Sequence, residues 1–200
     1  RENDMLLIVD DIQAGVGRTG PFFSFEPSGI KPDIITVSKS LSGFGLPLAI
    51  TMIRPDLDIW EPGEHNGTFR GNNHAFVTAV AALNHYWRDD AFEKEILRKG
   101  EYMRKRLNEI VDSHPGFNAE VRGRGMFIGV DCENADLADE VAAECFKHKL
   151  LLETAGPRDS VIKFMQAVNT SDADIDEGLD IVATALQTVL EKHGLPQSAA

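Results

Sequence analysis

The feature that most constrains the fold is a set of short, mainly apolar segments, each bounded by polar residues or turn formers. Residues 6–9 read Leu-Leu-Ile-Val and end at two aspartates, and residues 33–37 and 48–53 are further runs of this kind. Short apolar runs between turn signals are typical of strands buried on both faces, as in a helix-covered parallel sheet. The N-terminal part is therefore predicted to be an α/β sheet of parallel-type strands.

From about residue 73 the apolar spacing becomes that of a helix. Apolar side chains at steps of three and four predict helices over residues 73–87 and 92–110, with a break at 88–90. Pro115 stops the second helix. Residues 54–72, which precede the first helix, are predicted to be a long loop, and long ordered loops are often functional.

The rest of the chain alternates shorter elements. We predict strands over residues 126–130, 150–152 and 161–164 and helices over residues 137–149 and 175–189. Ser171 and Asp174 resemble a capping box, and Gly194 and Pro196 end the last helix. The predicted organisation is part of a larger α/β domain at 1–72, a helical connector at 73–98, a small α+β domain at 99–195 and a tail at 196–200.

Composition excludes several classes of protein. The chain has 20 basic and 32 acidic residues, and its formal net charge of −12 makes nucleic acid a poor partner. Cys132 and Cys145 are too few for a disulfide framework, which favours a reducing, cytoplasmic setting. No apolar run is long enough for a transmembrane helix. Neither the cysteines nor the histidines have metal-ligand spacing, so no metal site is predicted.

Three features at strand and helix ends suggest chemistry. Asp10 ends the first predicted buried strand, at the edge where open α/β sheets bind ligands, and a carboxylate there needs a cation or several donors. Lys39 follows the second strand among serines, and a lysine in a dry, crowded place can act as a Schiff-base amine. Residues 66–72 place a hydroxyl and a guanidinium before a helix start, where phosphate binds well. Taken alone, each feature is also explained as a turn or a solvated residue.

The glycine-rich segment 15–20 matches no nucleotide-binding loop. Its glycine spacing and context differ from those of a dinucleotide fingerprint, and no Gly-Lys-Ser/Thr follows as in a P-loop.

Asp10, Lys39 and the segment 66–72 together fit one kind of chemistry. A buried carboxylate can keep a pyridinium nitrogen protonated, a buried lysine can form an imine with an aldehyde, and a hydroxyl at a helix start can hold a phosphate. These are the protein's parts of a pyridoxal phosphate site.

Residues 10–20 and 32–43, with Lys39 placed 29 residues after Asp10, resemble the class III pyridoxal-phosphate-dependent aminotransferases. Gly67-Thr68-Phe69 resembles that family's phosphate-contact loop. The resemblance covers most of the chain and implies an α/β fold, the C-terminal half of a fold-type I transferase. That half comprises part of the large, mainly parallel-sheet domain and the small α+β domain.

The resemblance also implies a role for each matching residue. Lys39 would form the imine with pyridoxal 5'-phosphate and move the substrate proton, Asp10 would pair with the pyridinium nitrogen, and Gln13 would lie near the ring's 3′-oxygen. Thr68 would contact the phosphate of the cofactor that is bound in the neighbouring subunit. This implies a homodimer or larger homo-oligomer with shared active sites. Two details resemble one group of members in particular: Asp11, where most of the class has Glu, and the sequence of residues 65–72. The members of that group transfer an amino group from glutamate to aspartate 4-semialdehyde, the first step of ectoine biosynthesis.

Two departures from the family pattern stand out. The chain opens without an initiator Met or signal peptide and corresponds only to the C-terminal half, so we expect a piece of a longer protein. Lys163 also stands where many relatives have the Arg that takes the substrate carboxylate. Lys163 is thus a candidate substrate-binding residue, with a solvated strand residue as the alternative. Another ω-amino acid or diamine aminotransferase, or an inactive fragment, remain alternative functions.

Overall fold

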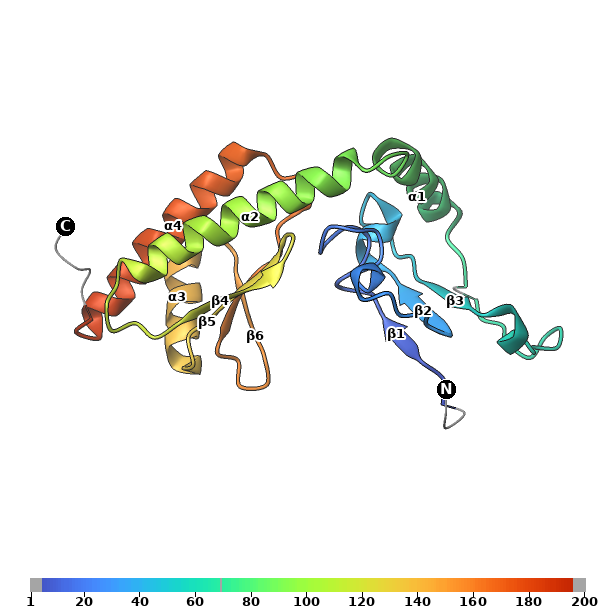
Figure 1. Ribbon diagram of the computed structural model, residues 1–200, viewed down its shortest axis with the longest axis horizontal. Coiled ribbons are helices and arrows are strands. Elements are labelled where there is room, and N and C mark those ends of the chain that lie inside the picture. The colour runs from blue at the N-terminus through green and yellow to red at the C-terminus, as the bar shows by residue number, and fades with distance from the viewer. Residues whose placement is uncertain (1–4, 69, 196–200) are drawn as a thin grey trace. The chain divides into compact units, whose positions relative to one another are not determined.

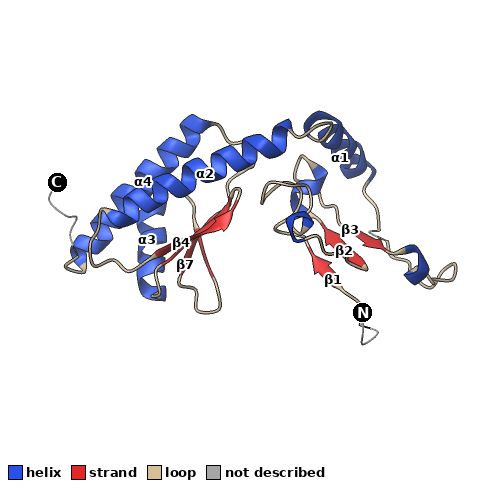
Figure 2. Cartoon of the chain, viewed as in Figure 1, coloured by secondary structure: helices blue, strands red, loops and turns tan. Residues whose placement is uncertain are grey.

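The computed structural model describes residues 5–68 and 70–195. The chain forms two compact units, Arg1–Lys94 and Glu95–Ala200, each of which has its own sheet and helices (Figures 1 and 2). The three-part domain division predicted from the sequence stays a prediction. Among the described residues, no helix is both long enough and apolar enough to cross a membrane.

The first unit contains a three-stranded sheet of order β1-β2-β3. Its strands are β1 (Ile8–Asp10), β2 (Ile34–Val37) and β3 (Ile50–Ile53), and β1 pairs with β2 in parallel. The third strand, in contrast, is antiparallel to β2, so the prediction of parallel-type strands throughout is wrong for β3. The β2–β3 connection holds only the short turn η2 (Lys39–Ser42) and lacks the crossover helix that a parallel pair needs.

The prediction that the first strand is buried on both faces is also wrong. Ile8 is 59% exposed, and the preceding Leu6 and Leu7 are 50% and 43% exposed. The buried cluster of this unit is small, because Val16, Val37 and Leu41 form its centre and a few partly buried apolar side chains pack around them. Within the described residues, β1 therefore has open apolar faces.

Helix α1 (Asn73–Tyr86) completes the first unit and begins at Asn72, whose side chain accepts hydrogen bonds from the amides of His74 and Ala75 at 3.1 and 3.3 Å. Its buried residues are Ala75 and Ala79. The predicted apolar face is instead exposed, with Val80 57% accessible. The small face is buried because η2 packs against α1, and only small side chains permit that approach.

The second unit packs three helices with an antiparallel sheet of order β4-β5-β7-β6. The strands are β4 (Glu120–Arg124), β5 (Phe127–Asp131), β6 (Glu153–Ala155) and β7 (Val161–Phe164). The helices are α2 (Ala91–Asp112), α3 (Ala135–Lys147) and α4 (Asp172–Lys192). Figure 1 shows α2 and α4 side by side, and ion pairs join them.

The core of the second unit follows the predicted helical spacing. Fully or nearly fully buried side chains come from α2, the sheet, α3 and α4: Ile96, Met103, Leu107, Ile128, Val141, Ile162, Leu179, Leu186 and Leu190. Burying a side chain of this size stabilises a fold by about 1.5–3 kcal/mol. The N-cap half of the predicted capping box is confirmed, because the Ser171 hydroxyl accepts a hydrogen bond from the Asp174 amide at 3.2 Å. The Asp174 carboxylate accepts from the Ser171 hydroxyl at 2.6 Å, in place of the backbone amide that a full capping box uses.

Two strand predictions in this unit differ from the structure. Residues 150–152 are not a strand, because β6 begins at Glu153, and Leu151 is 77% exposed. Strand β4 was not predicted, since its sequence Glu-Val-Arg-Gly-Arg lacks apolar alternation and its residues are mostly exposed at the edge of the sheet. Pro196 and the predicted tail 196–200 lie outside the described residues.

Candidate active site

The carboxyl ends of β1 and β2 carry the candidate residues Asp10 and Lys39. Because the two strands are parallel, both end at the same edge, and Asp10 pairs in register with Thr36. The Asp10 carboxylate accepts a hydrogen bond from the Ile12 amide at 3.1 Å and contacts the Thr36 hydroxyl at 3.5 Å. Lys39 begins the turn just after β2. The fold thus brings the predicted carboxylate and the predicted lysine to one sheet edge.

Asp10 is exposed, so its predicted burial is wrong. The buried carboxylate is that of its neighbour Asp11, whose side chain has no exposed surface. Asp11 accepts hydrogen bonds from the Ser24 amide at 3.0 Å and from the Ser24 hydroxyl. Successive side chains along extended backbone point to opposite sides, which is why only one of the two aspartates can face the interior.

Lys39 has an unusual backbone rather than the dry surroundings predicted for it. Its side chain is exposed, which corrects the expectation of a buried lysine. Its φ is +50°, in the left-handed region that non-glycine residues rarely adopt. The turn is held by the Ser38 hydroxyl, which donates to the Leu48 carbonyl at 2.6 Å, and by the buried side chain of Leu41. Such strain costs about 1–3 kcal/mol and is concentrated at functional sites.

Gln13 and Thr68 lie in the two loops where the sequence placed them. Gln13 is half-buried in the turn that follows β1, three residues beyond Asp10. The same loop is closed by a hydrogen bond from the Val16 amide to the Phe22 carbonyl at 2.7 Å. Thr68 is exposed in the loop before α1. Phe69, which the phosphate-loop resemblance includes, lies outside the described residues.

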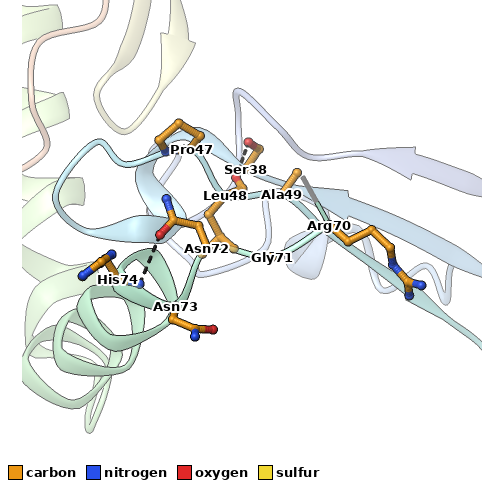
Figure 3. A pocket seen from close by; sticks show the side chains of 9 residues that line it. All are labelled: Ser38, Pro47, Leu48, Ala49, Arg70, Gly71, Asn72, Asn73 and His74. Carbon is orange, nitrogen blue, oxygen red and sulfur yellow. Dashed lines mark hydrogen bonds between the residues drawn. The ribbon is translucent and has the colours of Figure 1, made fainter. Parts of the chain in front are cut away.

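An open groove of about 800 Å³ lies between the Lys39 turn and the start of α1 (Figure 3). Its lining residues are Ser38, Pro47, Leu48, Ala49, Arg70, Gly71, Asn72, Asn73 and His74. Thus the residue before Lys39 and the end of the predicted phosphate loop border one space. Arg70 points away from the helix start in Figure 3, and its guanidinium donates to the His65 carbonyl at 2.5 Å.

Sequence reasoning did not single out Pro47 and Ala49 as members of this groove. The sequence feature that could have indicated them is the glycine-rich stretch after Lys39. Such a stretch lets the chain turn back after η2, and the returning chain then passes near the lysine. The antiparallel pairing of β3 with β2 brings residues 47–49, which lead into β3, back beside the Lys39 turn and so forms this side of the groove.

Lys163 lies in the second unit, in the strand predicted for it. In β7 its cross-strand neighbours are Gly129 on β5 and Glu153 on β6. The Lys163 ammonium lies 2.6 Å from a Glu153 carboxylate oxygen, and its side chain is only 15% exposed. The Lys163 cation is therefore paired with a carboxylate of the neighbouring strand, the largely exposed Glu153, and a role in substrate binding stays a prediction.

The two cysteines are buried and free. Burial raises the pKa of the Cys132 thiol to about 12 and that of Cys145 to about 11, so neither is a thiolate at neutral pH. In the described part of the chain, no group of three or more histidine, cysteine and acidic side chains could hold a metal ion. The sheet edge with Asp10 and Lys39 is therefore the candidate site.

The sequence pattern of the class III aminotransferases matches residues 1–186, so this chain belongs to that family. Solved class III aminotransferases have the same α/β architecture, in agreement with the fold-type I prediction.

The chain is 51% identical over 193 residues to a diaminobutyrate–2-oxoglutarate transaminase of Vibrio parahaemolyticus, and the match covers 96% of this chain and 46% of that protein. It is 51% identical over 191 residues to the enzyme of the same name from Halalkalibacterium halodurans, covering 96% and 44%. The chain thus spans about half the length of the curated relatives it matches.

Solved structures show the same partial coverage. An ornithine aminotransferase of Toxoplasma gondii, crystallised with partial occupancy of pyridoxal phosphate at its active site, superposes with a TM-score of 0.85 and 28% identity, covering 97% of this chain and 46% of that one. An N-acetylornithine aminotransferase of Stenotrophomonas maltophilia superposes with a TM-score of 0.81 and 28% identity, covering 96% and 49%.

Proposed function

We propose that the protein to which this chain belongs is a pyridoxal-phosphate-dependent aminotransferase that converts L-glutamate and L-aspartate 4-semialdehyde to 2-oxoglutarate and L-2,4-diaminobutyrate. The observation that carries the proposal is the shared sheet edge with Asp10 and Lys39. The choice of substrates is supported by two relatives about half identical to this chain that bear the name diaminobutyrate–2-oxoglutarate transaminase.

The donor set at this edge fits pyridoxal phosphate. The Lys39 amine, which is exposed in this chain, can attach an aldehyde, and the exposed carboxylate of Asp10 can pair with a pyridinium nitrogen. When bound, the cofactor supplies the electron sink that makes the substrate Cα acidic. Gln13 would sit beside the 3′-oxygen, and the Thr68 hydroxyl would contact the phosphate.

Lys39 and Asp10 then have distinct roles. The Lys39 amine would take the proton from the substrate Cα and deliver it to C4′ of the cofactor, a general acid–base role that is typically worth about 10²–10⁴-fold in rate. The Asp10 carboxylate keeps the ring nitrogen protonated, which stabilises the developing negative charge electrostatically.

Membership of the family also suggests how substrates bind and how subunits assemble. We propose that Lys163 contributes to binding a substrate carboxylate, for which its ammonium must exchange Glu153 for the substrate. We further propose a homodimer in which Thr68 of one subunit serves the site of the other. The reaction would be the first step of ectoine biosynthesis, and we propose that it takes place in the cytoplasm.

A second candidate is a class III aminotransferase that acts on another ω-amino acid or diamine. It is favoured by the structural likeness to ornithine and N-acetylornithine aminotransferases at 28% identity. The relatives named for diaminobutyrate are closer in sequence, which is why the first candidate is preferred.

The deciding experiment is a screen of amine donors and aldehyde acceptors with the full-length protein and pyridoxal phosphate, followed by product mass. We expect the highest kcat/KM for glutamate with aspartate 4-semialdehyde and a product with the mass of diaminobutyrate. A clear preference for ornithine or another diamine would favour the second candidate. A full-length protein that transfers no amino group to any acceptor would contradict both.

A further inference from the structure

Asp11 is a buried carboxylate that the proposed chemistry leaves unassigned. Its side chain has no exposed surface, whereas the adjacent Asp10, which the proposed function uses, is exposed. Burying an ionised carboxylate is costly unless donors meet it, because its hydration is lost. A chain that needed only a turn after β1 would not require a charge in this place.

Ser24 supplies both of the hydrogen bonds that the Asp11 carboxylate accepts here. The Ser24 amide donates to Oδ2 at 3.0 Å, and the Ser24 hydroxyl donates to Oδ1. The two residues are 13 positions apart, so this contact closes the whole loop that follows β1. Bonds to a charged acceptor are worth about twice those between neutral groups.

The loop is built closely around this contact. The Gly15 amide donates to the Asp11 carbonyl at 3.1 Å, and a Cβ at Gly15 would lie 2.5 Å from the Asp11 carboxylate. Position 15 therefore accepts no side chain while Asp11 keeps its place. Gly15, Asp11 and Ser24 thus form one packed unit.

Asp11 also fixes the backbone next to Asp10. Its amide donates to the Thr36 carbonyl at 2.9 Å, which continues the β1–β2 pairing one step beyond the strand. The groups that meet the Asp10 carboxylate are the Thr36 hydroxyl and the Ile12 amide. Thr36 is hydrogen-bonded to the Asp11 amide, and Ile12 is the residue after Asp11. A shift of Asp11 would therefore move both groups that contact the Asp10 carboxylate.

We propose that Asp11 and Ser24 are positioning residues that hold Asp10 in line for the ring nitrogen of pyridoxal phosphate, an inference that rests on the proposed function. The pair acts through the backbone and touches neither cofactor nor substrate. It converts a glycine-rich loop into a rigid support for the carboxylate at the sheet edge, because the buried charge loses its donors whenever the loop opens.

The test compares three serine variants of the full-length protein. Ser24→Ala removes the hydroxyl bond but keeps the amide, and Ser24→Thr restores a hydroxyl. Ser28→Ala is the matched control, since the exposed Ser28 hydroxyl donates to the Phe25 carbonyl and accepts from the Ile30 amide, and neither bond involves Asp11. Asp11→Asn removes a buried charge and risks misfolding, so Ser24→Ala is the deciding variant.

Two readouts are needed. In the cofactor-free protein, the amides of Gly15 and Val16 should exchange with solvent about tenfold faster in Ser24→Ala, as expected for the loss of one bond to a charged group. In the loaded enzyme, kcat should fall about tenfold with KM changed less than twofold, and Ser24→Thr should recover most of the loss. Ser28→Ala should match the wild type in both.

A kcat within twofold of the wild type in Ser24→Ala overturns the positioning role, even with faster exchange, because the pair would then be structural only. Equal losses in Ser24→Thr and Ser24→Ala overturn it as well. These results presuppose an active wild type. A wild type that binds no pyridoxal phosphate instead shows that the proposed function is wrong, and the positioning role falls with it.

Discussion

At the scale of single residues, the most informative observation is the left-handed backbone of Lys39. A lysine at φ +50° is held there by its neighbours, since the turn carries a buried Leu41 and a hydrogen bond from Ser38 to Leu48. The amine is thereby presented at the end of β2, next to the strand that carries Asp10. Backbone strain of this kind is concentrated at functional sites.

Replacing this lysine tests the proposed role directly. Lys39→Ala in the full-length protein should abolish the visible absorption of the lysine–cofactor link and lower kcat at least about a hundredfold, as for a lost general acid–base group. Absorption spectra and steady-state kinetics measure both. Lys31→Ala, an exposed lysine before the same strand, is the control and should change neither. Near-normal turnover in Lys39→Ala would disprove the assignment.

Lys163 poses a second question at this scale, because its ammonium already has a carboxylate partner in Glu153. If it also binds a substrate carboxylate, Lys163→Ala should raise KM for glutamate about five- to a hundredfold, the equivalent of about 1–3 kcal/mol. Turnover at saturation should fall less, and Lys163→Arg should keep much of the activity. A KM within about twofold of the wild type for both substrates would make Lys163 a structural partner of Glu153 alone.

At the scale of elements, the contact of η2 with α1 sets the position of the Lys39 turn. Gly43 ends η2 at φ +69°, and a Cβ there would lie 2.5 Å from the Ala82 Cβ on α1. The buried small face of α1 is thus matched to a glycine. This packing explains why the helix buries its alanines and leaves its larger apolar residues exposed.

A pair of glycine substitutions separates backbone strain from this contact. Gly43→Ala and Gly63→Ala both place a side chain at positive φ, but nothing lies within 4 Å of the added Cβ at Gly63. Gly63→Ala should therefore cost about 1–2 kcal/mol of stability, the price of a left-handed residue alone. Gly43→Ala should cost clearly more, as measured by thermal or urea unfolding. Equal losses would mean that the η2–α1 contact adapts freely.

Helices α2 and α4 are joined by charged side chains whose strength depends on pH. Arg98 donates to Glu95 and also to Asp172 of α4, and the hydrogen bond from Arg98 is the main cause that lowers the pKa of Glu95 to about 2. A carboxyl group with a lowered pKa stabilises the fold when ionised. That contribution is complete above its usual pKa near 4.5 and is lost as the pH falls towards about 2.

The expected result is a small effect, because Glu95 is 43% exposed and solvent screens the pair. Glu95→Gln should reduce the melting temperature at pH 6 and flatten its decline between about pH 4.5 and 3. Glu177→Gln, at an exposed position on α4, serves as the control and should keep the wild-type slope. Identical slopes in the two variants would show that the Glu95–Arg98 pair adds nothing to acid stability.

At the scale of the whole molecule, the first unit exposes more apolar surface than a self-sufficient domain does. Met5, Leu6 and Ile8 are at least half exposed around β1, and Val77 and Val80 are 70% and 57% exposed on α1. Large apolar patches of this kind mark surfaces that other protein covers. This agrees with a chain that spans about half the length of its relatives.

Expressing the 200-residue chain by itself tests this view. It should bind a hydrophobic dye such as ANS strongly and bind little pyridoxal phosphate, whereas the full-length protein should do the reverse, because ligand binding and assembly are linked. Dye fluorescence, cofactor absorbance and sedimentation measure the three properties. A monomeric 200-residue chain that binds pyridoxal phosphate tightly would contradict the proposed sharing of sites between subunits.

The sequence alone predicted most of the elements and singled out Asp10 and Lys39 as candidate site residues. Apolar periodicity located β2, β7 and the four α-helices, and the Ser171 cap was readable because capping depends on neighbours only a few residues away. Asp10 and Lys39 were identified for a similar reason: each directly follows an apolar strand. Such signals are local, so they survive without knowledge of the fold.

Only the tertiary structure decided direction, burial and partnership. It showed that β3 is antiparallel, that Asp11 rather than Asp10 is buried, and that Lys163 is paired with Glu153. Each of these depends on residues distant in sequence, since strand direction follows from the path of a connection and burial from what packs on each side. An isolated apolar run looks the same in either direction and on either face, which is why long-range packing was needed to choose.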